Sequence, residues 1–397
     1  MDMVVEKEEA TAAAGMDFME RLGPDTSAVV FAALRDPADL ARAATVSRSW
    51  RTLVMAVHLG KIQCLRMFPE VSVFTRGEQS TASASSSNNG VNEEDAGSTA
   101  AASAWENHKR EQRVYMRLAH ALLSNRTQTS CIASCIGASS TDTFPVESIQ
   151  NTLEPGELED FIPSYWSSGG QEDPEVPEFL VYQLCSDLCL IDEIRIQPFK
   201  AFFQHGHPIY SAQYVRVKFG CPKSPLRPED LVSEENEGQV TADDNYMWMY
   251  TPSEFPMLQE NVLQSFKLPC PVLCIGGVVK VEFLGRIQKQ EIDDLYYICI
   301  AHVQVLGTPL PRELGAAPCK NGIVLKYFPD HESSGGSGSS RPKWHDIEGR
   351  IWRELKATGQ GIGFDQALLS RLLGPSLQFA VEENGHGESK EVTRPLP

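Results

Sequence analysis

Three pairs of cysteines share a spacing that could hold a metal ion. Three residues separate the two thiols of each pair, which are Cys131/Cys135, Cys185/Cys189 and Cys270/Cys274. Tetrahedral zinc is commonly held by pairs two to four residues apart. Each pair, however, lies in an apolar, strand-like run with no histidine close by. In a reducing compartment such thiols act as small hydrophobic side chains, so we expect neither a metal nor any other cofactor.

A tryptophan beside two serines offers a second kind of chemistry, the binding of a sugar. An aromatic ring can stack on a sugar face while hydroxyls bond to it, and Trp166, Ser167 and Ser168 supply these groups. These three are therefore candidate ligand-binding residues. Large aromatic side chains are usually buried, so we favour the interpretation in which Trp166 fills the core at the start of a strand.

The sequence carries none of the short motifs by which common enzymes are recognised. It lacks H-E-x-x-H, G-x-S-x-G, a phosphate loop that ends in G-K-[ST], and a dinucleotide fingerprint. Gly359, Gly361 and Gly363 follow no strand-like run and favour a break between helices. We expect a binding protein rather than an enzyme, with catalysis supplied by its partners.

The balance of charges restricts the partners that this chain can bind. Its 397 residues contain 35 basic and 53 acidic side chains, a formal net charge of −18 at pH 7. Such a surface repels nucleic-acid phosphate and anionic lipid, so we expect neither a nucleic acid nor a membrane as partner. A protein partner fits this charge better.

The apolar runs are too short or too interrupted to direct the chain into a membrane. The first 15 residues contain acids and no continuous apolar core, so they lack the features of a secretory signal. The best candidate for a membrane span, residues 271–285, contains Lys280 and Glu282. We therefore expect the protein in the cytoplasm, the nucleus or both.

Residues 16–68 contain the start signals of three short helices. Pro24 is suited to a first helical turn, and the pair Asp36-Pro37 combines an N-cap with a proline at the first helical position. Ser47 is the next N-cap, and apolar residues follow Trp50 at positions i+3, i+4 and i+7. A helical domain therefore opens the folded part of the chain.

Residues 129–328 are typical of an antiparallel β-sandwich. Short runs rich in Val, Ile, Tyr and Phe, such as FLVYQL and GGVVKVEFLG, are separated by clusters of Gly, Pro, Asn and Asp. The predicted fold class is therefore α+β and multidomain, with helices at the N-terminus, a β-sandwich in the middle and helices at the C-terminus.

Composition divides the rest of the chain into tails, linkers and helices. Segments poor in aromatic and branched residues bury too little surface to fold. On this basis we expect disordered ends at 1–15 and 382–397, linkers at 75–104 and 332–342, and helices at 105–125 and 343–374.

The order of residues in the helical domain, 16–68, resembles the F-box. The matching residues are Leu22, Pro24, Asp25, Phe31 and Leu34, then D-P-x-D-L at 36–40 and V-S-R-x-W-R at 46–51. Gly23 separates Leu22 from Pro24, where the family usually has Leu-Pro. The resemblance implies a three-helix F-box that binds a Skp-type adaptor and, through it, a cullin. It implies adaptor contacts from Leu22, Pro24, Val30, Phe31, Leu34, Leu40, Val46 and Trp50.

A DNA-binding helix-turn-helix is the alternative interpretation of these helices. Residues 16–54 contain five arginines and five acids, whereas a segment that reads DNA is expected to be basic. The charge therefore favours the F-box.

The β-rich domain resembles a galactose-binding-type jelly roll, as found in discoidin-like modules. The segments that carry this resemblance are 139–155, 165–184 and 188–199. In such jelly rolls the loops at one end hold the ligand while the strands position them. Taken together with the F-box, the order of segments resembles a subfamily of plant F-box proteins over most of the chain.

The combined hypothesis is a substrate-recognition subunit of a Skp-cullin-F-box ubiquitin ligase. The β-rich domain would hold an unknown protein substrate near the catalytic partners. Two alternatives stay open: a receptor that binds a glycan on its target, and a scaffold that acts outside any ligase. A hidden enzyme is the third and least favoured class.

Overall fold

The computed structural model describes residues 18–56, 58–80, 96–124, 126–154, 164–226 and 241–329. The predicted disordered ends, the linker at 332–342 and the helices at 343–374 lie outside these described residues. Among the described helices, none combines the length and the apolar character that crossing a bilayer requires.

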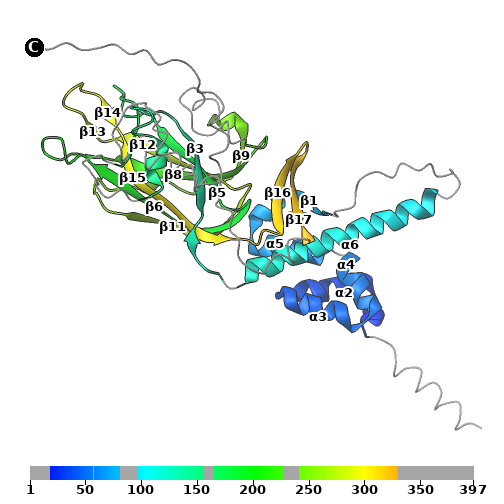
Figure 1. Ribbon diagram of the computed structural model, residues 1–397. Helices are drawn as coiled ribbons and strands as arrows, with labels where there is room; N and C mark the ends of the chain where they lie inside the picture. Colours follow the sequence, from blue (N-terminus) through cyan, green and yellow to red (C-terminus); the bar gives the residue numbers. More distant parts are fainter. Residues whose placement is uncertain are drawn as a thin grey trace, which may run out of the picture. The chain divides into compact units, whose positions relative to one another are not determined.

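Four short helices, which we call the helical unit, come first in the described chain (Figure 1). They are α2 (Phe18–Ala33), α3 (Pro37–Val46), α4 (Arg48–Ala56) and α5 (Leu59–Met67). Asp36 caps α3, because its carboxylate accepts the Ala38 N–H at 2.8 Å. Ser47 accepts the Trp50 N–H at 3.1 Å ahead of α4. The sequence predicted three helices here, and it missed α5, which follows the left-handed backbone of His58 (φ 50°).

The helical unit encloses a small apolar core. Its buried members are Met19, Phe31, Leu40, Ala43, Val54 and Leu59. The Trp50 ring packs edge-on against Phe31, with ring centroids 5.1 Å apart. Met116 of the long helix α6 (Ala96–Leu123) packs against the same core. On α6, Gln112 also forms a hydrogen bond of 2.8 Å with His58 Nδ1, so the helical unit is attached to this helix.

A three-stranded sheet joins two distant parts of the sequence. β1 (Phe74–Gln79) pairs in parallel with β17 (Gly322–Tyr327), which pairs antiparallel with β16 (Leu314–Cys319). Helix α6 packs on β1, where a Cβ at Gly77 would lie 3.2 Å from the Val114 side chain. The Gly77 N–H also donates to the Glu111 carboxylate at 3.1 Å. The apolar core at this sheet continues into the sandwich through Leu188, Leu190 and Ile275.

This sheet and α6 correct two sequence predictions. Residues 75–79 and 96–104, predicted as part of a linker, belong to β1 and α6. The sequence near the start of α6 is rich in alanine, which has high helix propensity, although it lacks the aromatic and branched residues that indicate a folded segment. Strands β16 and β17 do not extend the sandwich expected over 129–328, because they pair with β1 instead. Strand propensity does not specify the pairing partner.

Two antiparallel six-stranded sheets form the β-sandwich (Figure 1). One sheet has the order β10-β8-β12-β5-β3 with β9 beside β8, and the other has the order β11-β6-β15-β2 with β4 beside β15 and β7 beside β6. The bounds are β2 (Thr129–Ser130), β3 (Ile132–Ala138), β4 (Trp166–Ser167), β5 (Glu178–Leu184), β6 (Leu188–Lys200), β7 (Ile209–Tyr210), β8 (Ala212–Pro222), β9 (Tyr246–Tyr250), β10 (Phe255–Pro256), β11 (Gln264–Ile275), β12 (Val278–Arg286) and β15 (Cys299–Pro309). A short hairpin of β13 (Gln288–Lys289) and β14 (Tyr296–Tyr297) lies between β12 and β15 in sequence.

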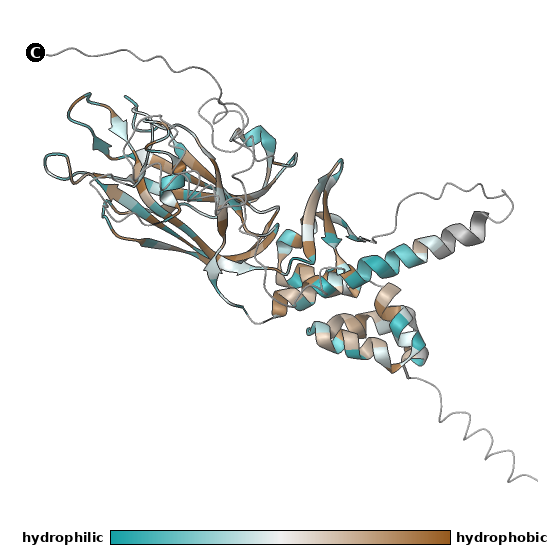
Figure 2. Ribbon diagram, viewed as in Figure 1, coloured by the Kyte–Doolittle hydropathy of each residue, from teal (hydrophilic) through white to brown (hydrophobic). Residues whose placement is uncertain are grey.

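Hydrophobic residues of both sheets form one core in the sandwich. Ile191 and Ile196 of β6, Val217 of β8, and Val281 and Phe283 of β12 are all fully buried in it. Figure 2 shows hydrophobic and hydrophilic residues interspersed along the same strands. This pattern is the one expected when one face of each sheet packs on the core and the other faces solvent.

A buried ion pair links the end of β12 to the start of β5. Arg286 and Glu178 are both buried, and the guanidinium donates to the Glu178 carboxylate. The same guanidinium donates to the carbonyl oxygens of Gly169 (2.9 Å), Tyr296 (2.9 Å) and Val176 (3.2 Å). A buried charge is costly unless it is paired and fully hydrogen-bonded, and these partners supply that compensation.

Replacement of Arg286 by alanine should lower the free energy of unfolding by about 3–5 kcal/mol, because Glu178 would keep a buried charge without its partner. Urea denaturation followed by intrinsic fluorescence measures the change. Lys289→Ala is the control, because the ion pair of Lys289 with Asp294 is solvent-exposed and such pairs contribute little. Equal midpoints for the two variants would contradict the role assigned to Arg286.

Candidate functional site

The helical unit exposes apolar side chains that nothing in the described chain covers. Leu22 is 41% exposed, Val30 is 42% exposed, and Val46, at the end of α3, is 62% exposed. These three belong to the set predicted to contact an adaptor. Val29, which precedes Val30, is also exposed. Isolated exposed apolar residues are common, but several on a small unit are typical of a surface that binds another protein.

Other members of the predicted contact set lie inside the helical unit. Phe31 (2% exposed) and Leu40 (0% exposed) are core residues, and their assignment as adaptor contacts is corrected. A unit this small needs its largest apolar side chains for its own core. Leu34 and Trp50 are half-buried against that core. Pro24 lies within α2, and its side chain is outside the described residues.

A backbone break separates the first predicted contact residue from the rest of α2. Gly23 has φ 77° and ψ 161° between two helical stretches. Glycine adopts such positive φ values without the steric penalty of a Cβ. Gly23, which separates Leu22 from Pro24 in the sequence, therefore marks a kink at which the backbone changes direction between Leu22 and the remainder of α2.

Phe31→Ala and Val30→Ala should separate core from surface on α2. Loss of the buried phenyl ring should destabilise the helical unit by about 3–5 kcal/mol, whereas Val30→Ala should change its stability by less than about 0.5 kcal/mol. Native-state hydrogen exchange of the amides in α2 to α4 measures both values. Similar effects of the two substitutions would show that this division of the helix is wrong.

The three predicted ligand-binding residues are buried at the β4 segment. Trp166 is fully buried, and its indole N–H donates to the Ser140 carbonyl oxygen at 3.0 Å. Ser168 is also fully buried, and its hydroxyl oxygen accepts the Ile298 N–H at 3.0 Å. The interpretation of Trp166 as a core side chain therefore holds, and neither residue can stack on or bond to a ligand at the surface. Ser167 alone lines a pocket.

This pocket has aromatic walls. Its volume is about 110 Å³, and it is lined by Asp142, Glu147, Tyr165, Ser167, Phe199, Ala201, Phe203, Gln204, Tyr210, Gln290, Tyr297 and Cys299. The rings of Tyr165 and Phe199 are stacked, with centroids 3.9 Å apart. Tyr210 and Tyr297 meet edge to face at 6.4 Å. Phe203, which is 62% exposed, lies at the rim.

The charged groups that line the pocket are acidic. Glu147 accepts a hydrogen bond from the Tyr165 hydroxyl through Oε1, while its Oε2 is buried without a hydrogen-bond partner among the described residues. Burial raises the pKa of the Glu147 carboxyl. Burial and the neighbouring charge of Asp293 raise the pKa of Asp142. No lysine or arginine lines the pocket within the described part of the chain, so its negative charge is uncompensated.

Aromatic faces beside desolvated carboxylates favour a positively charged guest. The negative face of an aromatic ring attracts ammonium and guanidinium groups, and an unpaired buried carboxylate gains from a cation that compensates its desolvation. The volume of about 110 Å³ is below the roughly 300–1,000 Å³ of common small-molecule sites. The pocket therefore fits one side chain or a group of similar size, rather than a cofactor.

These pocket residues lie far apart in the sequence and carry no shared motif. They come from the loop after β3, from β4 and the residue before it, from the end of β6 and the loop after it, from β7, from the loop after β13, and from β14 and β15. Neither acid lies in a motif, and each aromatic residue resembles an ordinary strand residue in its local context. Only Ser167 was predicted, as a neighbour of Trp166.

Comparison with known proteins finds one curated relative of high similarity. An F-box protein of Arabidopsis thaliana is 47% identical over 299 residues, which cover 75% of this chain and 78% of that protein. No protein-family model matches the chain.

Comparison with solved structures gives matches that cover just under half of the chain. The family 32 carbohydrate-binding module of C. perfringens NanJ, in complex with galactose, is 12% identical with a TM-score of 0.25, over 44% of this chain and 98% of that one. An F5/8 type C domain from Bacteroides fragilis is 11% identical with a TM-score of 0.31, over 47% and 99%. The family 32 module of Streptococcus pneumoniae EndoD is 10% identical with a TM-score of 0.29, over 45% and 98%.

Proposed function

The chain belongs to the F-box family of proteins, and from that premise we propose that it is the substrate-recognition subunit of a Skp-cullin-F-box ubiquitin ligase. The observation that carries the proposal is the 47% identity to an F-box protein over most of both chains. In this role the chain performs no chemistry of its own. It raises the effective concentration of a target lysine near the conjugating enzyme, in the cytoplasm or the nucleus.

The exposed side chains of α2 and α3 are the proposed contact surface for the Skp-type adaptor. Leu22, Val30 and Val46 offer apolar area whose burial by a partner helix is favourable by about 25 cal/mol per Å². Phe31 and Leu40 act indirectly, because they hold these helices together from inside. The adaptor would then connect the chain to a cullin.

The double variant Leu22→Asp, Val30→Asp should lose the adaptor, because two charges would be buried at an apolar interface. Co-purification with a recombinant Skp-type adaptor measures retention. The control is Leu258→Asp, Val262→Asp, which places the same charges at two exposed apolar positions of the sandwich domain. Equal retention by both double variants would refute the proposed contact surface.

The pocket in the sandwich is the proposed recognition point for the target protein. Its stacked aromatic rings, the unpartnered Glu147 Oε2 and the absence of lining cations among the described residues support the binding of a lysine or arginine side chain. The exposed Phe203 at the rim offers apolar contact to residues beside that side chain.

Glu147→Gln should weaken binding of basic peptides without unfolding the sandwich, because the amide oxygen can still accept the Tyr165 hydroxyl hydrogen bond. An array of peptides with one lysine or arginine, and copies with norleucine or citrulline instead, measures this preference. Binding should also fall as the pH decreases, because protons compete with the cation, and the raised pKa values of Glu147 and Asp142 place that fall at a higher pH than for ordinary carboxyls.

Glu106→Gln is the matched control, because it removes the same charge from an exposed position on α6. Equal binding of lysine and norleucine peptides would contradict a cation pocket. Binding of a glycan array that is insensitive to Glu147→Gln would favour the glycan receptor instead. A complex isolated from cells that contains the chain and the adaptor but no cullin would favour the scaffold.

A further inference from the structure

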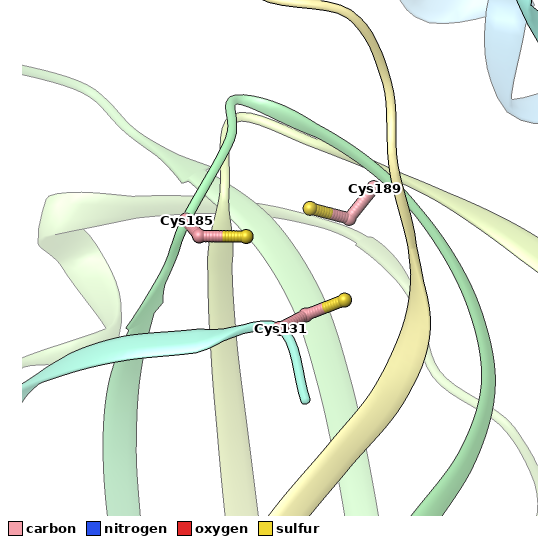
Figure 3. A group of neighbouring side chains, drawn as sticks. All are labelled: Cys131, Cys185 and Cys189. Atoms are coloured by element: carbon pink, nitrogen blue, oxygen red, sulfur yellow. The ribbon is translucent and has the colours of Figure 1, made fainter. Parts of the chain in front are cut away.

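Three cysteine thiols converge at the turn between β5 and β6. Cys131 precedes β3, Cys185 lies in the turn, and Cys189 is the second residue of β6. Their three sulfur atoms all lie within 4.8 Å of one another. Figure 3 shows the side chains of Cys185 and Cys189 directed toward each other, with that of Cys131 beside them. The ten cysteines all fall within the described residues, and none of them forms a disulfide.

Backbone hydrogen bonds hold these three positions in place. The Cys185 N–H donates to the Cys131 carbonyl oxygen at 2.8 Å, and the Cys131 N–H donates to the Val305 carbonyl oxygen at 2.7 Å. Cys189 lies opposite Cys274 on one neighbouring strand and opposite Pro309 on the other. The thiols are therefore positioned by the sandwich itself, without need for a ligand to assemble them.

The separation of the sulfurs suits a single metal ion. Zinc–thiolate bonds of about 2.3 Å in a tetrahedral site place sulfur atoms about 3.8 Å apart. An upper limit of 4.8 Å between the sulfurs requires only small side-chain rotations to reach that spacing. Cys131 and Cys189 are buried while Cys185 is exposed, so a fourth position on the solvent side could be taken by water.

We propose that Cys131, Cys185 and Cys189 bind one zinc ion through three thiolates, with water as the fourth ligand. Binding converts three thiols and one aqueous Zn²⁺ into a Zn(S-Cys)₃(H₂O) centre and releases three protons, with no change of oxidation state. The ion joins the segment before β3 to the β5–β6 turn, so it stabilises this end of the sandwich. The proposal is independent of adaptor and target binding.

Metal analysis of the full-length chain tests this proposal. After purification under anaerobic, reducing conditions, mass spectrometry should find about one zinc per chain. Replacement of zinc by Co²⁺ should produce thiolate-to-cobalt charge-transfer absorption and the intense visible bands of a tetrahedral site. Both signals should disappear in Cys185→Ser, a variant at an exposed position that leaves the core thiols in place.

Cys270→Ser is the matched control, because Cys270 is also exposed and also lies four residues from a buried cysteine, Cys274, but outside the cluster. It should keep the metal and the cobalt spectrum. Zinc content unchanged by Cys185→Ser overturns the proposal. So does a wild-type chain that binds neither zinc nor cobalt, one that carries copper in place of zinc, or one with a disulfide between two of these thiols under the same conditions.

Discussion

The buried ion pair of Arg286 with Glu178 is the interaction on which the end of the sandwich that contains the pocket depends. The guanidinium links β12 to Glu178 at the start of β5, and it donates to two backbone carbonyls of the loop between β4 and β5 and to one of β14. Its partners Ser168 and Tyr296 are each the immediate neighbour of a pocket residue, Ser167 and Tyr297. An apolar side chain could fill the same volume, but it could not hold this loop and β14 by directed hydrogen bonds. We infer that Arg286 positions the pocket walls through the backbone.

The parallel pairing of β1 with β17 is the second constraint on the architecture. It connects β1, which follows the helical unit after a short 3-10 helix at Pro69–Val73, to the last described strand of the chain. Helix α6 packs against β1 and also contributes Met116 to the core of the helical unit. The connection between the F-box segment and the β-rich domain is therefore structured. Helix α6 packs against the core of the helical unit, and α6 and the three-stranded sheet share a core with residues of the sandwich.

Charge has different roles on the two proposed binding surfaces. The exposed residues of α2 and α3 that define the adaptor surface are uncharged, so its binding would rely on the burial of apolar area. The pocket instead contains carboxyls that burial makes harder to ionise. A cationic group on the target would be attracted to these carboxyls and would stabilise their charged form. The net charge of −18 acts in the same direction at longer range.

Local sequence signals determined the elements, whereas tertiary contacts decided the sites. The caps at Asp36 and Ser47, the order of F-box residues and the runs of β-branched and aromatic residues could all be interpreted from the sequence, because each depends on neighbours a few positions away. The partner of β1, the burial of Phe31 and Leu40, the acid-lined pocket and the meeting of Cys131 with Cys185 could not be predicted. Each of these needs residues from separate elements to meet in space. Periodicity specifies which face of an element is buried, but not which other element covers that face.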